Sequence, residues 1–213
     1  APSKVFCRRD KTMEWGRRSM LISPRHLLDR LRHPRSRADD LARLRARFAA
    51  QPTAGQATPR QLELARELRE LRSALSAALA DVASCHSCAR GHGLPHGRWD
   101  GGHCCGTHTL NVYSPQEVAA LKLSGSRAES FEPPRADHAC CVFRGPSGCS
   151  LDAADRPNVC VRYVCPTLRE ELRARPDWPR IKELRKRLAG AFDELTASLE
   201  QADSDRYFSS AFR

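Results

Sequence analysis

The sequence predicts a mainly α-helical protein in which helical N- and C-terminal flanks pack around a loop-rich, cysteine-rich lobe. Leucines recur at helical spacing before residue 85 and after residue 165. Between these flanks the helical period is lost and Gly and Pro interrupt the chain, with six glycines between residues 91 and 106. Nine of the ten cysteines and six of the eight histidines lie in this central segment. The chain therefore divides into helical flanks and a centre that carries most of its thiols.

The first flank, residues 1–57, is predicted to be a helical arm. Ser23-Pro24 supplies an N-cap and a first-turn proline for a short helix that ends before Pro34. A second helix, beginning near Ser36, places three apolar side chains on one stripe: Leu41, Leu44 and Phe48. Residues 51–56 contain Pro and Gly and are predicted to form a linker.

This arm also carries most of the net charge. Residues 1–47 hold 14 Lys or Arg against five Asp or Glu, whereas the rest of the chain holds 22 against 20. A basic segment of this kind can bind nucleic acid or an acidic protein, so either is a candidate partner of residues 1–47. The alternative is a solvated helix face without a partner.

The clearest helix is predicted over residues 58–84. Thr58-Pro59-Arg60-Gln61 has the capping-box pattern, and apolar side chains follow along one face: Leu64, Leu68, Leu71, Leu75, Leu79 and Val82. Such a stripe is typical of a core-facing helix.

Shorter helices are predicted further along the chain. Ser114-Pro115-Gln116-Glu117 begins a short capped helix inside the central segment. In the second flank, residues 166–213, Thr167 and Glu170 again have capping-box spacing. A last helix begins at about Pro179 and carries an apolar stripe: Ile181, Leu184, Leu188, Phe192, Leu195 and Leu199.

The central segment, residues 85–165, contains the candidate metal ligands. Cys85-His86-Ser87-Cys88 is a C-x-x-C pair, whose short turn brings two sulfurs within reach of one ion. The complete set of candidate ligands is Cys85, Cys88, Cys104, Cys105, Cys141, Cys149, Cys160 and Cys165. Whether Cys140 or the histidines also bind is left open.

Electrostatics favours a metal over unrelated thiols. Neighbouring thiolates raise one another's pKa, and a bound cation removes that penalty. Arg144, Arg156 and Arg162 lie close to the cysteines in sequence and are candidates to donate hydrogen bonds to sulfur. The alternatives are buried thiols with no common role and a disulfide framework.

The second half of this segment resembles a known family. The run from Cys141 through Gly148-Cys149 to Arg156-Pro157-x-x-Cys160, preceded by Cys85-x-x-Cys88 and Cys104-Cys105, is similar to the YkgJ-like cysteine-cluster family. That family is described as a zinc- or iron-chelating domain of the C-x-x-C-x-x-C-C type. The resemblance departs in its first half, because 15 residues separate Cys88 from Cys104, and this insertion supplies further histidines: His92, His96 and His103. The resemblance implies a metal- or cluster-binding module.

Cysteine-rich ligation suits both zinc and an iron–sulfur cluster. We favour the cluster as cofactor, since eight thiols exceed what one structural zinc needs. Two zinc ions, each held by four thiolates, would use the same number.

Three functions are therefore predicted, in this order: a metal-binding protein, a zinc-stabilised adaptor that uses the basic arm, and a protein lysine N-methylase-like enzyme. The last rests on the resemblance alone, because some members of that family are flagellin lysine N-methylases. No strand followed by a glycine loop suited to an adenosyl group is visible in the sequence. With neither a leader nor an apolar run long enough to span a bilayer, the sequence predicts a cytoplasmic protein with no membrane contact.

Overall fold

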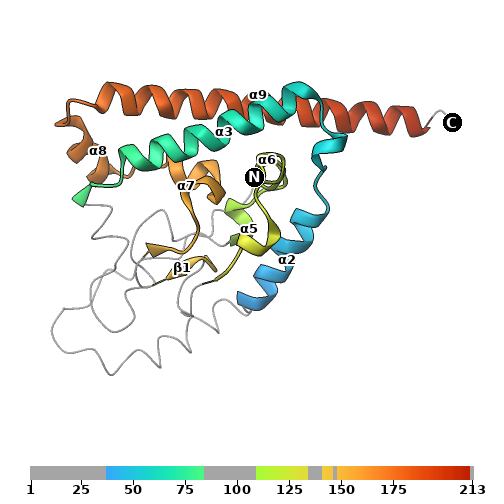
Figure 1. Ribbon diagram of the computed structural model, residues 1–213, viewed down its shortest axis with the longest axis horizontal. Coiled ribbons are helices and arrows are strands. Elements are labelled where there is room, and N and C mark those ends of the chain that lie inside the picture. Colours follow the sequence, from blue (N-terminus) through green and yellow to red (C-terminus); the bar gives the residue numbers. More distant parts are fainter. Residues whose placement is uncertain (1–36, 84–108, 134–140, 146–147, 212–213) are drawn as a thin grey trace.

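The computed structural model describes residues 37–83, 109–133, 141–145 and 148–211 (Figure 1). Over these residues the chain is mainly helical, as the sequence predicts. The α-helices, labelled as in Figure 1, are α2 (Arg37–Ala49), α3 (Pro59–Ala78), α5 (Thr109–Val112), α6 (Pro115–Leu123), α7 (Asn158–Arg162), α8 (Pro166–Arg173) and α9 (Trp178–Ala211). Three short 3-10 turns are η2 (Ala54–Gln56), η4 (Ala128–Ser130) and η5 (Ala153–Asp155), and one hairpin joins β1 (Arg144–Gly145) to β2 (Gly148–Cys149). The helix predicted after Ser23-Pro24 lies outside the described residues.

Helices α3 and α9 form an antiparallel pair along one side of the molecule (Figure 1). Their direction is marked by ion pairs between Arg60 and Glu194, 2.7 Å apart, and between Arg187 and Glu67, 2.9 Å apart. The leucine stripes predicted for both helices face each other, and apolar side chains of α6, α7 and α8 pack against them. We call the result the first cluster; its buried residues are Leu64, Ala65, Leu68, Leu71, Leu75, Val82, Ala119, Ala120, Leu123, Val161, Val164, Leu168, Leu172, Ile181, Leu188, Ala191, Leu195 and Leu199.

The predicted capping box at the start of α3 is confirmed. The Thr58 hydroxyl accepts a hydrogen bond from Gln61 N at 3.2 Å, and Gln61 Oε1 accepts one from Thr58 N at 2.9 Å. The far end differs from the prediction, because α3 stops at Ala78 rather than near Ser84. There the Leu79 N–H bonds to Ser76 O, which tightens the last turn.

The helices after Cys165 begin close to the predicted positions. Helix α9 starts at Trp178, one residue before the predicted start at Pro179. Helix α8 starts at Pro166, so its N-cap is Cys165 and not the predicted Thr167. A proline at the first helical position lacks only an N–H that would have no partner inside the helix.

A second cluster fills the space between α2, α5, α6 and the hairpin. Its buried residues are Leu41, Leu44, Phe48, Val112, Tyr113, Val118, Leu121, Phe131, Val142, Phe143 and Leu151. Four of them are aromatic and pack as one group. Phe131 lies edge-on to Phe48 and Tyr113, with ring centroids 5.3 and 6.0 Å apart, and Phe143 lies 5.6 Å from Tyr113.

Each cluster combines residues from more than one of the predicted segments. Helix α2, from the N-terminal arm, packs in the second cluster beside residues of the cysteine-rich stretch. Val161 and Val164, from that stretch, pack in the first cluster with α3 and α9. Helix α6 contributes to both clusters, because its buried side chains point in opposite directions. The described part of the cysteine-rich stretch is therefore built into the common fold.

Candidate metal centre

The hairpin carries two of the predicted ligands. Its strands are antiparallel, with Arg144 opposite Cys149 and Gly145 opposite Gly148. Cys141 lies at the base of the hairpin, where the neighbouring Val142 N–H donates to the buried Thr109 hydroxyl at 2.9 Å. This bond ties the hairpin to α5 and fixes its position on the second cluster.

A third predicted ligand, Cys160, lies on α7 and is positioned by a buried carboxylate. Glu117 of α6 is only 5% exposed. It accepts hydrogen bonds from Asn158 N and Asn158 Nδ2, both at 2.9 Å, and from Val159 N at 3.3 Å. The backbone N–H groups of Asn158 and Val159 belong to the first turn of α7 and have no partner inside the helix. A negative charge at this end also complements the helix dipole.

Burial has an electrostatic cost at Glu117. It raises the pKa of the Glu117 carboxyl above its usual value, because the charged form loses hydration; the bonds from Asn158 and Val159, and the charge of Arg72, oppose this shift. The carboxylate is therefore held by a dense set of donors, as a buried charge requires.

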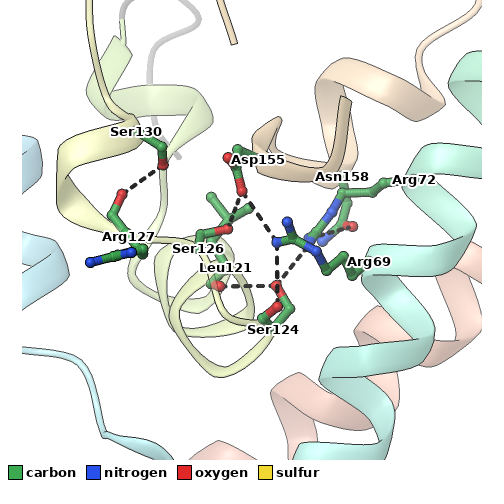
Figure 2. A network of polar contacts seen from close by, with 9 residues as sticks. All are labelled: Arg69, Arg72, Leu121, Ser124, Ser126, Arg127, Ser130, Asp155 and Asn158. Carbon is green, nitrogen blue, oxygen red and sulfur yellow. Dashed lines mark hydrogen bonds and ion pairs between the residues drawn. The ribbon is translucent and has the colours of Figure 1, made fainter. Parts of the chain in front are cut away.

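Arg72, from α3, reaches the side chain of Asn158, the residue that also donates to Glu117 (Figure 2). Its side chain is fully buried. Arg72 Nη2 donates to Ser124 Oγ at 2.8 Å, and Nη1 lies 3.5 Å from Asn158 Oδ1. Desolvation lowers the pKa of Arg72 to about 10, so the guanidinium stays charged at neutral pH. Helix α3 thus holds both the end of α6 and the start of α7.

A parallel set of contacts holds η5, just before α7 (Figure 2). Asp155 accepts a hydrogen bond from Ser126 Oγ at 2.6 Å and pairs with Arg69 Nη1 at 3.3 Å. Arg156 Nε, next in the chain, donates to Leu151 O at 2.9 Å. This side chain therefore braces its own loop.

The fold brings Cys141, Cys149 and Cys160 to the same region. All three are half-buried and pack against the second cluster. Tyr113 belongs to the same cluster, and its side chain is 1% exposed. The pKa of the Tyr113 hydroxyl is raised well above its usual value, first by burial and then by the charges of the three thiolates and Glu117. The three cysteines and Tyr113 therefore belong to one part of the fold.

Cys165 is placed differently from these three. Its sulfur accepts the N–H of Leu168 at 3.4 Å as the N-cap of α8, and its side chain packs against the first cluster. The other four predicted ligands, Cys85, Cys88, Cys104 and Cys105, lie outside the described residues, as do Cys140 and all eight histidines. Within the described ranges, no group of three or more His, Cys, Asp or Glu residues is arranged to hold a metal ion.

Two residues of this site were not anticipated as parts of it. Glu117 was predicted only as part of a capping box, and nothing in the sequence links it to Asn158, 41 residues later. Tyr113 lies just before that capping box with no pattern of its own. Both act through contacts between distant parts of the chain, which no local spacing reveals.

Part of the basic arm has internal partners. Arg45 Nη2 donates to Phe131 O at 3.3 Å. Arg47 Nη1 donates to Leu110 O at 3.1 Å and also to Tyr113 O. These two arginines hold α2 against the second cluster, and the arm before residue 37 lies outside the described residues.

A search of protein-family models, curated proteins and solved structures finds no match to this chain. The resemblance to the cysteine-cluster family therefore stays a prediction from the sequence. In the described part of the chain, no helix has an apolar stretch of the length that crossing a membrane requires.

Proposed function

We propose that this protein binds iron, as an iron–sulfur cluster, or zinc, through a cysteine cluster that includes Cys141, Cys149 and Cys160. One observation carries the proposal: three half-buried cysteines, from the hairpin and from α7, pack against the same aromatic cluster. Thiolates are the ligands that zinc and iron–sulfur clusters share. The remaining ligands are proposed to come from Cys85, Cys88, Cys104 and Cys105.

The surroundings of the three cysteines fit a bound cation. Burial disfavours a thiolate, and neighbouring thiolates disfavour one another. The nearby carboxylate of Glu117 adds a further negative charge, offset by the buried Arg72. A metal ion would neutralise the charge of the sulfurs and so remove this penalty.

The cofactor would supply either structural cross-linking, as zinc does, or electron transfer, as a cluster does. The chain's own residues would set its position. Glu117 fixes the start of α7 and so the direction of Cys160, and Thr109 fixes the strand that follows Cys141. No observation on the described residues favours the adaptor or the lysine N-methylase alternative.

The test compares two cysteine substitutions of the full chain after anaerobic purification. Cys160→Ser is expected to lower the content of iron and sulfide, or of zinc, because it removes a ligand. Cys165→Ser is the matched control: serine is a good N-cap, so α8 should keep its start and the metal should be retained. Metal and sulfide are measured by elemental analysis and the ultraviolet–visible spectrum.

Each result has a defined meaning. Brown wild-type protein with iron and sulfide supports a cluster, and colourless protein with zinc supports a structural site. Wild-type protein with neither metal after anaerobic purification and reconstitution contradicts the proposal. Equal losses in the two variants would show that Cys165 belongs with the other ligands, contrary to its placement against the first cluster.

A further inference from the structure

Three arginines from three helices lie together where α7 ends. Arg162 is the last residue of α7, and its carbonyl oxygen accepts a hydrogen bond from Arg185 Nε of α9 at 2.9 Å. Arg169 belongs to α8, which follows α7 after a short turn. This turn and α8 are fixed along α9, because Val164 and Leu168 are buried in the first cluster together with residues of α9. The packing of the three helices therefore gathers the three positive charges.

The gathering of these charges has an electrostatic cost. Burial, and then the charges of Arg162 and Arg169, lower the pKa of Arg185 below its usual value. In the described part of the chain, none of the three side chains forms an ion pair, and Arg185 Nε is the one side-chain nitrogen of theirs that donates a hydrogen bond. Arginines elsewhere in the helical flanks do pair with carboxylates, namely Arg60, Arg69, Arg175 and Arg187. The three gathered guanidinium groups thus keep N–H donors for an anion.

The same side of α9 carries two exposed lysines. Lys182 lies three positions before Arg185 and four before Lys186, and these spacings place side chains on one face of a helix. Arg187 lies on the other flank, where it pairs with Glu67 of α3. We call the resulting surface the basic face; its residues are Arg162, Arg169, Lys182, Arg185 and Lys186. It is distinct from the predicted basic arm, residues 1–47, on which the adaptor alternative depends.

Two exposed apolar side chains lie beside the basic face. Among the described residues, Tyr163 and Val159 are the exposed large apolar side chains, at 44% and 39% of their surface. Tyr163 follows Arg162 directly, and Val159 lies one turn earlier on α7. An acidic protein segment would use the positive charges alone. A nucleic acid also offers bases, which stack on exposed aromatic rings next to cations.

We propose that the basic face binds single-stranded nucleic acid, with phosphates on its arginines and lysines and a base stacked on Tyr163. This function goes beyond metal binding and does not depend on a metal. A guanidinium presents paired N–H donors that match the oxygens of a phosphate. The negative backbone would also offset the repulsion between the arginines. RNA and DNA share this chemistry.

The test measures the binding of fluorescently labelled oligo(U) RNA and oligo(dT) DNA to the full chain by fluorescence anisotropy at several salt concentrations. Arg162→Gln/Arg169→Gln is expected to weaken binding by about tenfold or more and to make it less sensitive to salt, because two phosphate contacts are lost. Thermal melting should be unchanged, since neither side chain donates a hydrogen bond within the described ranges.

Tyr163→Leu separates stacking from charge. It should weaken binding by about tenfold while the dependence on salt stays the same, because stacking involves no counterions. Unchanged affinity in this variant would overturn the assignment to nucleic acid, since positive charge alone would then explain the binding.

Arg43→Gln/Arg66→Gln is the matched control. It removes the same charge from exposed arginines of α2 and α3, so the affinity should stay close to that of the wild type. Equal weakening by the two arginine variants would show a general attraction to the positive protein and would overturn the proposal. A wild type that binds neither oligonucleotide at low salt would overturn it as well, and displacement of the oligonucleotide by polyglutamate would assign the basic face to an acidic protein.

Discussion

The two hydrophobic clusters are built from different materials. The first is aliphatic and lies mostly between α3 and α9, whose leucine stripes face each other along their length. The second combines four aromatic rings with three half-buried cysteines, and it is built from α2, α5, α6, the hairpin and α7. A helix pair can be stable from apolar burial alone. The second cluster has thiols at its edge, so it is the part that a bound metal would stabilise.

The largest expected effects come from truncating one buried side chain in each cluster. Phe131→Ala should lower the free energy of unfolding by about 4 kcal/mol and reduce metal content, because Phe131 packs beside Tyr113 and Phe143. Leu68→Ala, in the first cluster, should cost about 3 kcal/mol and leave the metal bound. Denaturant unfolding and elemental analysis of the folded protein measure both. Equal metal loss in the two variants would show that the clusters are not separable.

The next effect concerns the contact that joins α6 to α7. Glu117→Ala removes the acceptor of three hydrogen bonds and should cost about 3 kcal/mol, since Asn158 is left with two buried donors. Metal affinity should fall as well, because α7, which carries Cys160, loses its hydrogen bonds to α6. Glu67→Ala is the control on an exposed ion pair with Arg187 and should change stability by under about 0.5 kcal/mol. Unaltered metal binding by Glu117→Ala would show that α7 is held by other contacts.

A smaller effect is expected where the first cluster begins. Thr58→Ala removes the N-cap hydroxyl of α3 and should lower the free energy of unfolding by about 1 kcal/mol. Metal content and the spectrum should stay the same, because this end of α3 lies in the helix pair. A changed spectrum would mean that the first cluster also supports the cysteines.

The smallest effect concerns pH and the other end of the helix pair. Arg175 bonds Asp81 at 2.7 Å and Asp177 at 2.8 Å, and these bonds lower the pKa of both carboxyls below their usual 3.8. The folded state therefore binds these protons less tightly than the unfolded chain. Their contribution to stability is present above pH 3.8 and is lost as the pH falls through the lowered values.

Arg175→Gln should remove that acid-sensitive contribution. Thermal melting of the metal-free protein should show a small advantage of the wild type at pH 6 that disappears at low pH. The effect is small because solvent screens exposed pairs. An advantage that grows on acidification would contradict this assignment.

Local patterns predicted the helices well and the site only in part. The Thr58 capping box, the leucine stripes and the start of α9 are set by neighbours in sequence, so a reader of the sequence can find them. The end of α3 is not set by neighbours in sequence, because Arg175, far away in the chain, donates to Ala78 O and to Asp81 at this end.

The placement of the cysteines shows the same limit. Spacing alone groups Cys165 with Cys160, five residues earlier, yet the two side chains pack against different clusters. Their separation follows from α7 and the turn after it, which carry the chain from one cluster to the other. Likewise, the partner of Glu117 depends on tertiary packing between α6 and α7, for which a single sequence holds no local signal.

The hydrogen bonds between Glu117 and the start of α7 can form only after a long stretch of chain has been synthesised. The two residues it joins are 41 positions apart, so α6 emerges from the ribosome well before its carboxylate can meet Asn158. Cys85, Cys88, Cys104 and Cys105 emerge earlier still, and their thiols must wait until residue 160 has been made before the proposed ligand set is complete. Until then these thiols lack the proposed metal, so the yield of folded protein is expected to depend on how reducing the surroundings are.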